Sequence, residues 1–221
     1  MEYYASDFGK LALLLLLIIG CKNETHPPKE WHQPKKLEKV IKDGDIIFQT
    51  SLSSQSEAIQ RATHSKYSHC GLLFKRKYKN DEWCVLEAVQ PVKWTPLSSW
   101  IKRGKGKHYV IKRLTTDPMI PDSMLAELRE IAESYIGKDY DLYFDWSDKN
   151  VYCSELIWKS YYKLNRFEIG KLQRLGDFDL SDKVVKQKLM ERYGTKIPAN
   201  ELVISPDAIF NSGLLKTVKT N

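Results

Sequence analysis

Tyr152-Cys153-Ser154-Glu155 and Ser68-His69-Cys70-Gly71 are the two segments of this chain that indicate its fold most directly. The first places a cysteine at the apparent start of a helix, and the second places a histidine in an apolar, strand-like run. Glu87 lies between them in the sequence. A thiol, an imidazole and a carboxylate can together form a nucleophilic triad. The sequence therefore predicts a cysteine hydrolase or acyltransferase.

Cys153 is the candidate nucleophile. A thiol at the N-terminus of a helix lies near the positive end of the helix dipole and near unpaired backbone N–H groups. Both features favour the thiolate and lower the pKa of the thiol. The same N–H groups can stabilise a developing oxyanion. The alternative is that Cys153 is an ordinary buried cysteine at a helix start.

His69 is the candidate base and Glu87 is its candidate partner. Side chains alternate along a strand, so we expect Cys70 to face away from a site that contains His69. Glu87 interrupts an otherwise apolar strand, where a carboxylate is costly unless a group such as an adjacent histidine pairs with it. The alternatives are a core or surface histidine and a glutamate that faces water at a sheet edge.

Metal binding is the competing use of His, Cys and Glu side chains. No ligand pair with the spacing of a metal site supports it in this sequence. We therefore expect no metal site and no other cofactor.

The segment 1–20 is expected to be a lipoprotein signal peptide. Lys10 precedes an apolar run at 11–19, which is too short to span a bilayer and suits the apolar region of a secretory signal. The run leads to Gly20-Cys21, a pattern that resembles the bacterial lipobox. The resemblance implies cleavage before Cys21 and lipid attachment to it, which would tether the protein to a membrane. An ordinary signal peptide or a short anchor is the alternative.

Residues 21–39 are expected to be the lipidated cysteine and a flexible tether, because they are polar and rich in Pro and Lys. Lys22, rather than Asp, follows Cys21. Under the enterobacterial sorting convention this implies the outer membrane and periplasm of a bacterial cell envelope, with the cell surface as another location. Residues 40–221 are expected to form the catalytic domain, since that length suits one sizeable core.

The charge of the chain indicates what kind of partner it binds. The formal net charge is +7, with lysines scattered through the domain. This is not the clustered stripe typical of nucleic-acid binding, so we expect no nucleic-acid partner. Scattered positive charge favours solubility or contact with anionic surfaces such as lipid headgroups. The sequence leaves the oligomeric state open.

Three cysteines remain once Cys21 is assigned to lipid: Cys70, Cys84 and Cys153. An odd number is unusual in an oxidising compartment. Either Cys70 and Cys84 form a disulfide between neighbouring strands, or both are buried residues that act as small apolar side chains. We favour the second interpretation.

The pattern of apolar residues predicts an α+β domain, with strands first and helices after, around one core. Strands are expected at 46–50, 68–74, 83–89 and 109–114. Helices are expected at about 54–62, 121–137, 153–164 and 182–193. The first helix would begin with a capping box, Ser54-Gln55-Ser56-Glu57. Residues 94–97 read as the start of a connector with one helical turn.

Six segments resemble the YiiX-type family of circularly permuted papain-like amidases, which is distantly related to NlpC-type cell-wall peptidases and lecithin–retinol acyltransferases. The resemblance covers roughly residues 40–215. The matching segments are Gly44-Asp45-Ile46-Ile47-Phe48-Gln49, Ala62-Thr63-His64-Ser65, Tyr67-Ser68-His69, Leu86-Glu87-Ala88-Val89, Gly137-Lys138-Asp139-Tyr140-Asp141 and Tyr152-Cys153-Ser154-Glu155-Leu156. Papain-like enzymes usually place Cys before His, and the reversed order here fits a permuted chain. The resemblance implies a small antiparallel sheet or barrel packed against helices.

The family resemblance also implies roles for individual residues. Cys153 would be the nucleophile, His69 the base and Glu87 the third member of the triad. Backbone N–H groups near Cys153, helped by the Tyr152 hydroxyl, would hold the oxyanion. Glu155 would bind a substrate amine, or it would only supply negative charge at a helix start. Cys70 departs from the family pattern, which usually has an ordinary apolar or small residue there.

The implied activity is amide hydrolysis or acyl transfer through a thioester. Peptidoglycan peptides are the expected substrate, because the chain carries an export signal and resembles relatives of wall peptidases. A lipid-acyl hydrolase or acyltransferase is one alternative. A non-catalytic lipoprotein that binds a wall or lipid ligand is another.

Overall fold

The computed structural model describes residues 35–221 except 77–80 and 117–119. Its helices are α1 (Lys35–Glu38), α2 (Ser56–Thr63), α3 (Leu97–Arg103), α4 (Asp122–Glu133), α5 (Cys153–Asn165), α6 (Lys183–Tyr193) and α7 (Pro206–Phe210). Its strands are β1 (Ile46–Gln49), β2 (His69–Arg76), β3 (Glu82–Glu87), β4 (Lys93–Pro96), β5 (Val110–Leu114), β6 (Gln173–Arg174), β7 (Leu202–Val203) and β8 (Leu215–Thr220).

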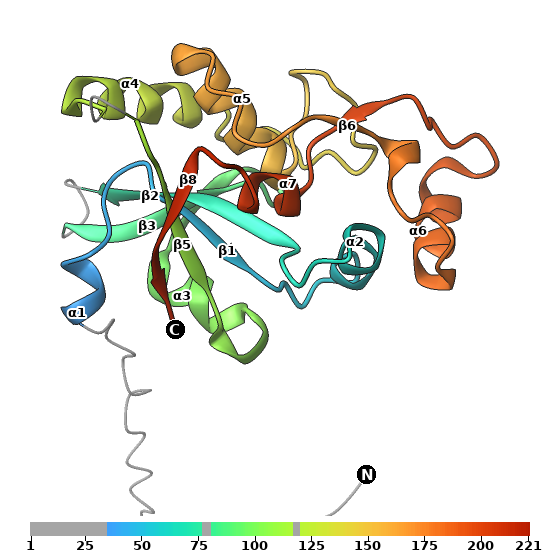
Figure 1. The fold of residues 1–221 in the computed structure, drawn as a ribbon, viewed down its shortest axis with the longest axis horizontal. Coiled ribbons are helices and arrows are strands. Elements are labelled where there is room, and N and C mark those ends of the chain that lie inside the picture. Colours follow the sequence, from blue (N-terminus) through green and yellow to red (C-terminus); the bar gives the residue numbers. More distant parts are fainter. Residues whose placement is uncertain (1–34, 77–80, 117–119) are drawn as a thin grey trace, which may run out of the picture. The chain divides into compact units, whose positions relative to one another are not determined.

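Six strands form one antiparallel sheet in the order β4-β3-β2-β1-β5-β8 (Figure 1). The register places Gln49 of β1 opposite His69 of β2, and Leu72 of β2 opposite Leu86 of β3. The strands β4 and β8 lie at the two edges, so the sheet formed by the described residues is open. The α+β class and the antiparallel sheet are therefore confirmed, and the closed barrel is not formed.

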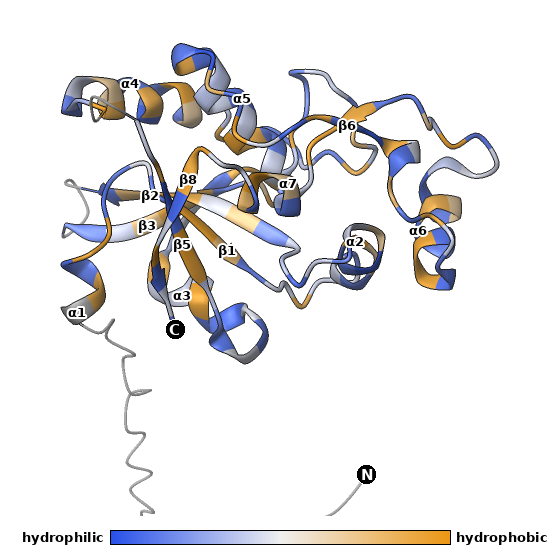
Figure 2. Cartoon of the chain, in the orientation of Figure 1, coloured by the Kyte–Doolittle hydropathy of each residue, from blue (hydrophilic) through white to orange (hydrophobic). Residues whose placement is uncertain are grey.

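The two faces of the sheet bury two different clusters, as alternation along a strand requires. One face packs against α4 and α5, and its strand residues include Ile46, Phe48, Cys70, Leu72 and Leu86. The other packs against α1 and α3, and its strand residues include Ile47, Leu73, Val85 and Ile111. Figure 2 shows β1 as almost wholly apolar, which fits a strand buried on both faces, whereas α2, α4 and α5 alternate between apolar and polar residues.

Helix α5 is the element that brings the nucleophile candidate to the sheet. Leu156, Ile157 and Tyr161 lie in the cluster that covers one face, and the Tyr161 hydroxyl donates a hydrogen bond to the backbone oxygen of Gly44. Gly44 has φ +81°, a left-handed conformation that favours glycine. The turn that contains Gly44 leads into β1 beneath the helix. The N-terminus of α5 lies at the opposite end of β1, at the start of β2, where Cys153 is beside His69.

The structure corrects three local expectations. Helix α2 begins at Ser56 with no side-chain cap, so the predicted capping box is wrong; Glu57 instead pairs with Arg61. Residues 93–103 form β4 and α3 rather than a connector with one turn. The predicted tether ends too late, because α1 is helical and Leu37 is only 2% exposed in the core.

The predicted signal peptide and its lipidation site at Cys21 lie outside the described residues. Within the part of the chain that the structure describes, no helix has both the length and the apolar character needed to cross a bilayer.

Candidate active site

The three residues predicted as a triad come from the ends of three elements. Cys153 is the first residue of α5, His69 is the first residue of β2, and Glu87 is the last residue of β3. Since β2 and β3 are antiparallel, the start of one strand lies beside the end of the other. His69 Nε2 lies 2.6 Å from Glu87 Oε2, and the His69 ring also hydrogen-bonds with the Cys153 thiol. The structure therefore brings all three side chains together in the predicted order.

The electrostatics of this row favour an ion pair. Burial alone would lower the pKa of His69, but the hydrogen bonds and charges of Cys153 and Glu87 outweigh it and raise the pKa to about 9. Burial would raise the pKa of Glu87, but His69 and Arg103 lower it to about 2. A hydrogen bond from Cys70 opposes burial and, together with His69, holds the pKa of Cys153 well below its usual value. A thiolate beside an imidazolium is the favoured state near neutral pH.

Glu87 is fixed by residues that the sequence analysis did not identify. Its side chain is fully buried, and it accepts hydrogen bonds from Thr95 Oγ1 at 2.6 Å and from Trp100 Nε1 at 2.9 Å. Arg103 donates a third, charge-assisted bond. The Trp100 ring also stacks on His69, with ring centroids 5.9 Å apart. These residues lie in β4 and α3, so the helix that the sequence analysis missed holds the acid and the base in place.

Cys70 lies in the site, contrary to expectation. The alternation is as predicted, because Cys70 faces α5 while His69 contacts Trp100 on the opposite face. However, both residues lie at the beginning of β2, where the N-terminus of α5 reaches the sheet. Cys153 therefore contacts the side chains on both faces. Cys70 is a free thiol, so the Cys70–Cys84 disulfide is not formed.

Tyr152 and Glu155 lie beside Cys153 but are used within the protein. The Tyr152 hydroxyl accepts a hydrogen bond from the Ile204 backbone N–H at 2.9 Å. Glu155 is fully buried, accepts from the Tyr152 N–H at 3.2 Å and pairs with Lys159 at 2.8 Å. Burial, opposed by Lys159, raises the pKa of Glu155 to about 7. An enclosed carboxylate with these partners caps α5, which favours the expected alternative of negative charge at a helix start, and contact with a substrate amine stays a prediction.

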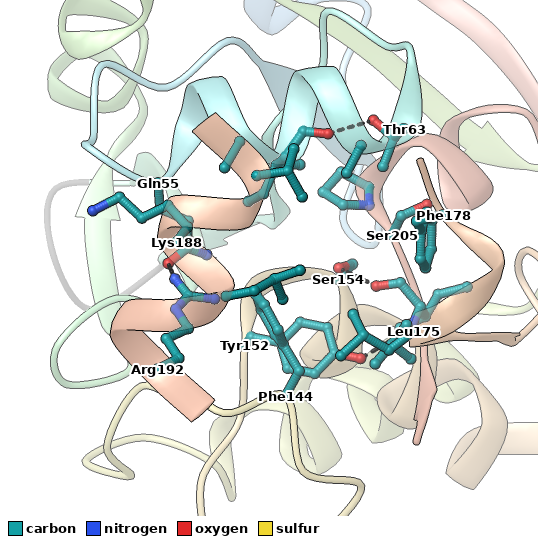
Figure 3. A pocket seen from close by; sticks show the side chains of 18 of the residues that line it. Gln55, Thr63, Phe144, Tyr152, Ser154, Leu175, Phe178, Lys188, Arg192 and Ser205 are labelled. Atoms are coloured by element: carbon teal, nitrogen blue, oxygen red, sulfur yellow. Dashed lines mark hydrogen bonds between the residues drawn. The ribbon is translucent and has the colours of Figure 1, made fainter. Parts of the chain in front are cut away.

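A cavity of about 100 Å³ opens beside Cys153, between α2 and α6. Figure 3 shows Phe144, Leu175 and Phe178 directed into it, with Arg192 at one side. Its wall is mainly apolar and includes Ala58, Ile59, Ala62, Phe144, Tyr152, Leu175, Phe178, Leu180, Val185, Leu189 and Val203. Such a wall suits an uncharged, apolar part of a ligand.

Tyr140 is a polar side chain of this wall to which the sequence analysis gave no role. Its hydroxyl accepts a hydrogen bond from Gln55 Nε2 at 3.0 Å, and Gln55 Oε1 in turn accepts from Arg192. Burial and the nearby charge of Cys153 raise the pKa of Tyr140 well above its usual value, so its proton is retained. This proton is available to an acceptor near the thiol. The signal was present, since Tyr140 belongs to one of the segments that carry the family resemblance.

Comparisons with known proteins agree with the fold. A family model described as "Permuted papain-like amidase enzyme, YaeF/YiiX, C92 family" matches residues 40–219. A protein from Escherichia coli strain K12 described as "Uncharacterized protein YiiX" is 47% identical over 175 residues, which are 79% of this chain and 84% of that protein. A crystal structure described as that of "metalloprotein yiiX from Escherichia coli O157:H7" is 46% identical, with a TM-score of 0.77, and the match covers 82% of this chain and 98% of that one.

Proposed function

Because the chain belongs to the YaeF/YiiX family of permuted papain-like amidases, we propose that it hydrolyses amide bonds through a thioester on Cys153. His69 is the general base and acid, and Glu87 orients and stabilises its imidazolium. The observation that carries this proposal is the continuous row from Cys153 through His69 to the buried carboxylate of Glu87.

The first half of the reaction uses groups that the site already holds. The Cys153 thiolate attacks the amide carbonyl carbon, and the negative charge moves to the carbonyl oxygen. The first N–H groups of α5 and the Tyr140 hydroxyl donate hydrogen bonds to this oxyanion. His69 then gives its proton to the leaving amine as the carbon–nitrogen bond breaks, which leaves a thioester and a neutral imidazole.

The second half regenerates the enzyme. His69 takes a proton from water, and the resulting hydroxide attacks the thioester. The carbon–sulfur bond breaks, the acid leaves, and the thiolate–imidazolium pair is restored. Glu87 keeps its negative charge throughout, because its pKa is about 2 and its oxygens are fully hydrogen-bonded.

The wall of the cavity favours a substrate with an apolar acyl group. The cavity of about 100 Å³ lies beside the thiol and has a mainly apolar wall, so it can bury the part of a short acyl chain next to the scissile amide. This supports the lipid-acyl alternative more directly than a peptidoglycan peptide, whose stem is largely polar. We therefore place N-acyl amides first among candidate substrates and amides of peptidoglycan peptides second.

A matched series of substrates separates these two classes. N-acyl amides that share one amine and differ by one methylene should gain up to about fourfold in kcat/KM per carbon until the cavity is filled, since each buried methylene is worth about 0.8 kcal/mol. The variant Ala58→Leu narrows the cavity and should end the gain at a shorter chain, and Thr63→Ser is a milder control on the same wall. Cleavage of peptidoglycan stem peptides, together with N-acyl amide cleavage that does not depend on acyl length, would instead favour peptidoglycan as the substrate.

A third class, a ligand-binding protein without catalysis, has its own test. Iodoacetamide should alkylate Cys153 rapidly at neutral pH in the wild type, because the thiolate is the reacting form. Slow alkylation equal to that of the other thiols, with no turnover of any amide, would favour binding alone.

Export and lipid attachment form the second part of the proposal. They are supported by the apolar run at 11–19 and by Gly20-Cys21. The mature protein would begin at lipidated Cys21. It would lie in the cell envelope, at the outer membrane or in the periplasm. Cys21→Ser should abolish incorporation of a fatty-acid label, with Cys84→Ser as the cysteine control. Unchanged labelling and processing of Cys21→Ser would disprove this part.

Metal chemistry has no place in the proposed steps. One relative is described as a metalloprotein. In the described part of this chain, no three His, Cys, Asp or Glu side chains are grouped so that they could hold a metal ion.

A further inference from the structure

Cys70 is a buried nucleophilic group that amide hydrolysis does not use. Its thiol and its backbone N–H both hydrogen-bond to the Cys153 sulfur. Cys70 is completely buried, and Cys153 is 2% exposed. Both belong to the cluster between the sheet and α5. Two thiols in contact, one of them held as a thiolate, form a pair that an oxidant can join.

The two elements that carry these cysteines face one another. Cys70 points from β2 toward α5, and Cys153 is the residue at which α5 begins. Sulfur atoms already in hydrogen-bond contact need a shift of roughly 1–2 Å to reach the length of a disulfide. Cys70 belongs to β2 and Cys153 to α5, so secondary structure holds the two side chains opposite each other.

The two sulfur atoms differ in their access from outside. Cys153 lines the cavity beside α2, whereas Cys70 does not line it and lies behind Cys153. Burial, followed by the neighbouring Cys153, raises the pKa of Cys70 well above its usual value, so Cys70 stays protonated. A small oxidant therefore meets the Cys153 thiolate first, and a bulky thiol does not reach Cys70.

We propose that a hydroperoxide oxidises Cys153 and that Cys70 then closes a Cys70–Cys153 disulfide, which switches the site off reversibly. The inference rests on the proposed function only in using Cys153 as the reactive thiolate. Closure removes the nucleophile and the hydrogen bond that Cys70 gives it. It also protects the site, since a sulfenic acid that finds no thiol can be oxidised further to an irreversible sulfinic acid.

The chemistry balances in two steps. The Cys153 thiolate attacks one peroxide oxygen, the oxygen–oxygen bond breaks, and the products are Cys153 sulfenic acid and, after one proton is taken up, water or an alcohol. The Cys70 sulfur then attacks the Cys153 sulfur and displaces its hydroxyl group. That hydroxyl leaves with the Cys70 proton as water, and the disulfide carries the two-electron oxidation.

Peptide mapping tests this without any substrate. The full-length protein in detergent is treated with hydrogen peroxide, alkylated in acid and digested with trypsin without reduction. The expected product joins peptides 67–75 and 150–159 with the loss of two hydrogen atoms. Alkylation of Cys153 should fall roughly tenfold after peroxide and recover after a phosphine reductant, because the thiolate is the alkylated form.

Variants show which thiol resolves the sulfenic acid. Cys70→Ser and Cys70→Ala should form no such link and should accumulate Cys153 sulfinic acid that reductant does not reverse. Cys84→Ser, on the neighbouring strand, should link as the wild type does. Sulfinic acid on Cys153 of the wild type without the link, or a Cys153 that peroxide leaves unoxidised, would overturn the proposal. A protein that links but cleaves no amide would instead contradict only the proposed hydrolase.

Discussion

Replacing Glu87 with glutamine removes a negative charge from the site while keeping the shape of the side chain. The carboxylate lies 2.6 Å from His69 Nε2, and its pKa of about 2 stands roughly 2.5 units below the ordinary 4.5. That difference is worth roughly 3 kcal/mol of preference for the charged form, after burial has opposed it. Both His69 and Arg103 contribute to this preference. The side chain of Arg103 is 41% exposed, so solvent screens its charge and reduces its contribution.

The coupling between two charges is mutual, so the loss of Glu87 must lower the pKa of His69. We expect a fall of about 1–2 units from its wild-type value near 9. The raised pKa of His69 stabilises the folded protein below pH 6.5, and this stabilisation is lost as the pH rises through about 9. In Glu87→Gln the loss should occur at lower pH, and the alkaline limb of kcat/KM should move down with it.

Histidine NMR measures this pKa directly. The chain has five histidines, and the His69 signal is assigned by its disappearance in His69→Ala. Asp45→Asn is the matched control, since Asp45 is also a fully buried carboxylate but pairs with Arg113 at the other end of β1. It should leave the pKa of His69 unchanged. A His69 pKa that stays near 9 in Glu87→Gln would refute the electrostatic account.

Three further predictions concern single side chains. Cys153→Ala should abolish amide turnover, and His69→Ala should slow it by roughly 10²–10⁴-fold in steady-state assays, because base and ion-pair partner are lost together; turnover near the wild-type rate in either folded variant would contradict the mechanism. Tyr140→Phe should lower kcat by about 10² or more with little change in Cys153 alkylation, since only the oxyanion donor is removed; an unchanged kcat would remove Tyr140 from the mechanism. Glu155 loses its proton at about pH 7 in the folded state but at about pH 4.5 in the unfolded state. The free energy of unfolding of the wild type should therefore decrease as the pH rises from 4.5 to 7, by up to roughly 3 kcal/mol. Glu155→Gln should abolish that fall in denaturant titrations at pH 5 and pH 8, and parallel losses in both proteins would disprove the raised pKa.

The meeting of His69, Glu87 and Cys153 was predictable because each lies at the end of an element with a clear local signal. His69 and Glu87 stand in apolar strands that form an antiparallel pair, and Cys153 opens an amphipathic helix. The segment pattern of the family then implies their roles, which remain a proposal. The four central strands of the six-stranded sheet were also predictable, whereas the two edge strands, β4 and β8, were not.

The supports of Glu87 were not predictable from local patterns. Strand β4 has four residues and ends at Pro96, so it is too short to show alternation, and proline argues against a strand except at an edge. Helix α3 has seven residues, and its contact with Glu87 depends on tertiary packing. Without these elements, the partners Thr95 and Trp100 carry no signal.

Cys70 shows where a correct local rule gave a wrong conclusion. The alternation rule assigns faces to residues in the middle of a sheet, where a helix on one face cannot reach the other. His69 is the first residue of β2, and the end of a strand can be approached from both faces. The site is built at this end, so the residue that faces away from His69 still contacts Cys153.

Trapping the acyl-enzyme is the most direct test of the central claim. The protein is mixed with an N-acyl amide, quenched in acid within the first turnover, and digested for mass spectrometry. The account predicts one acyl group on Cys153 in peptide 150–159, released by hydroxylamine and absent from Cys153→Ala. Amide cleavage with no acyl group on Cys153, or an acyl group carried by Cys70, would contradict it.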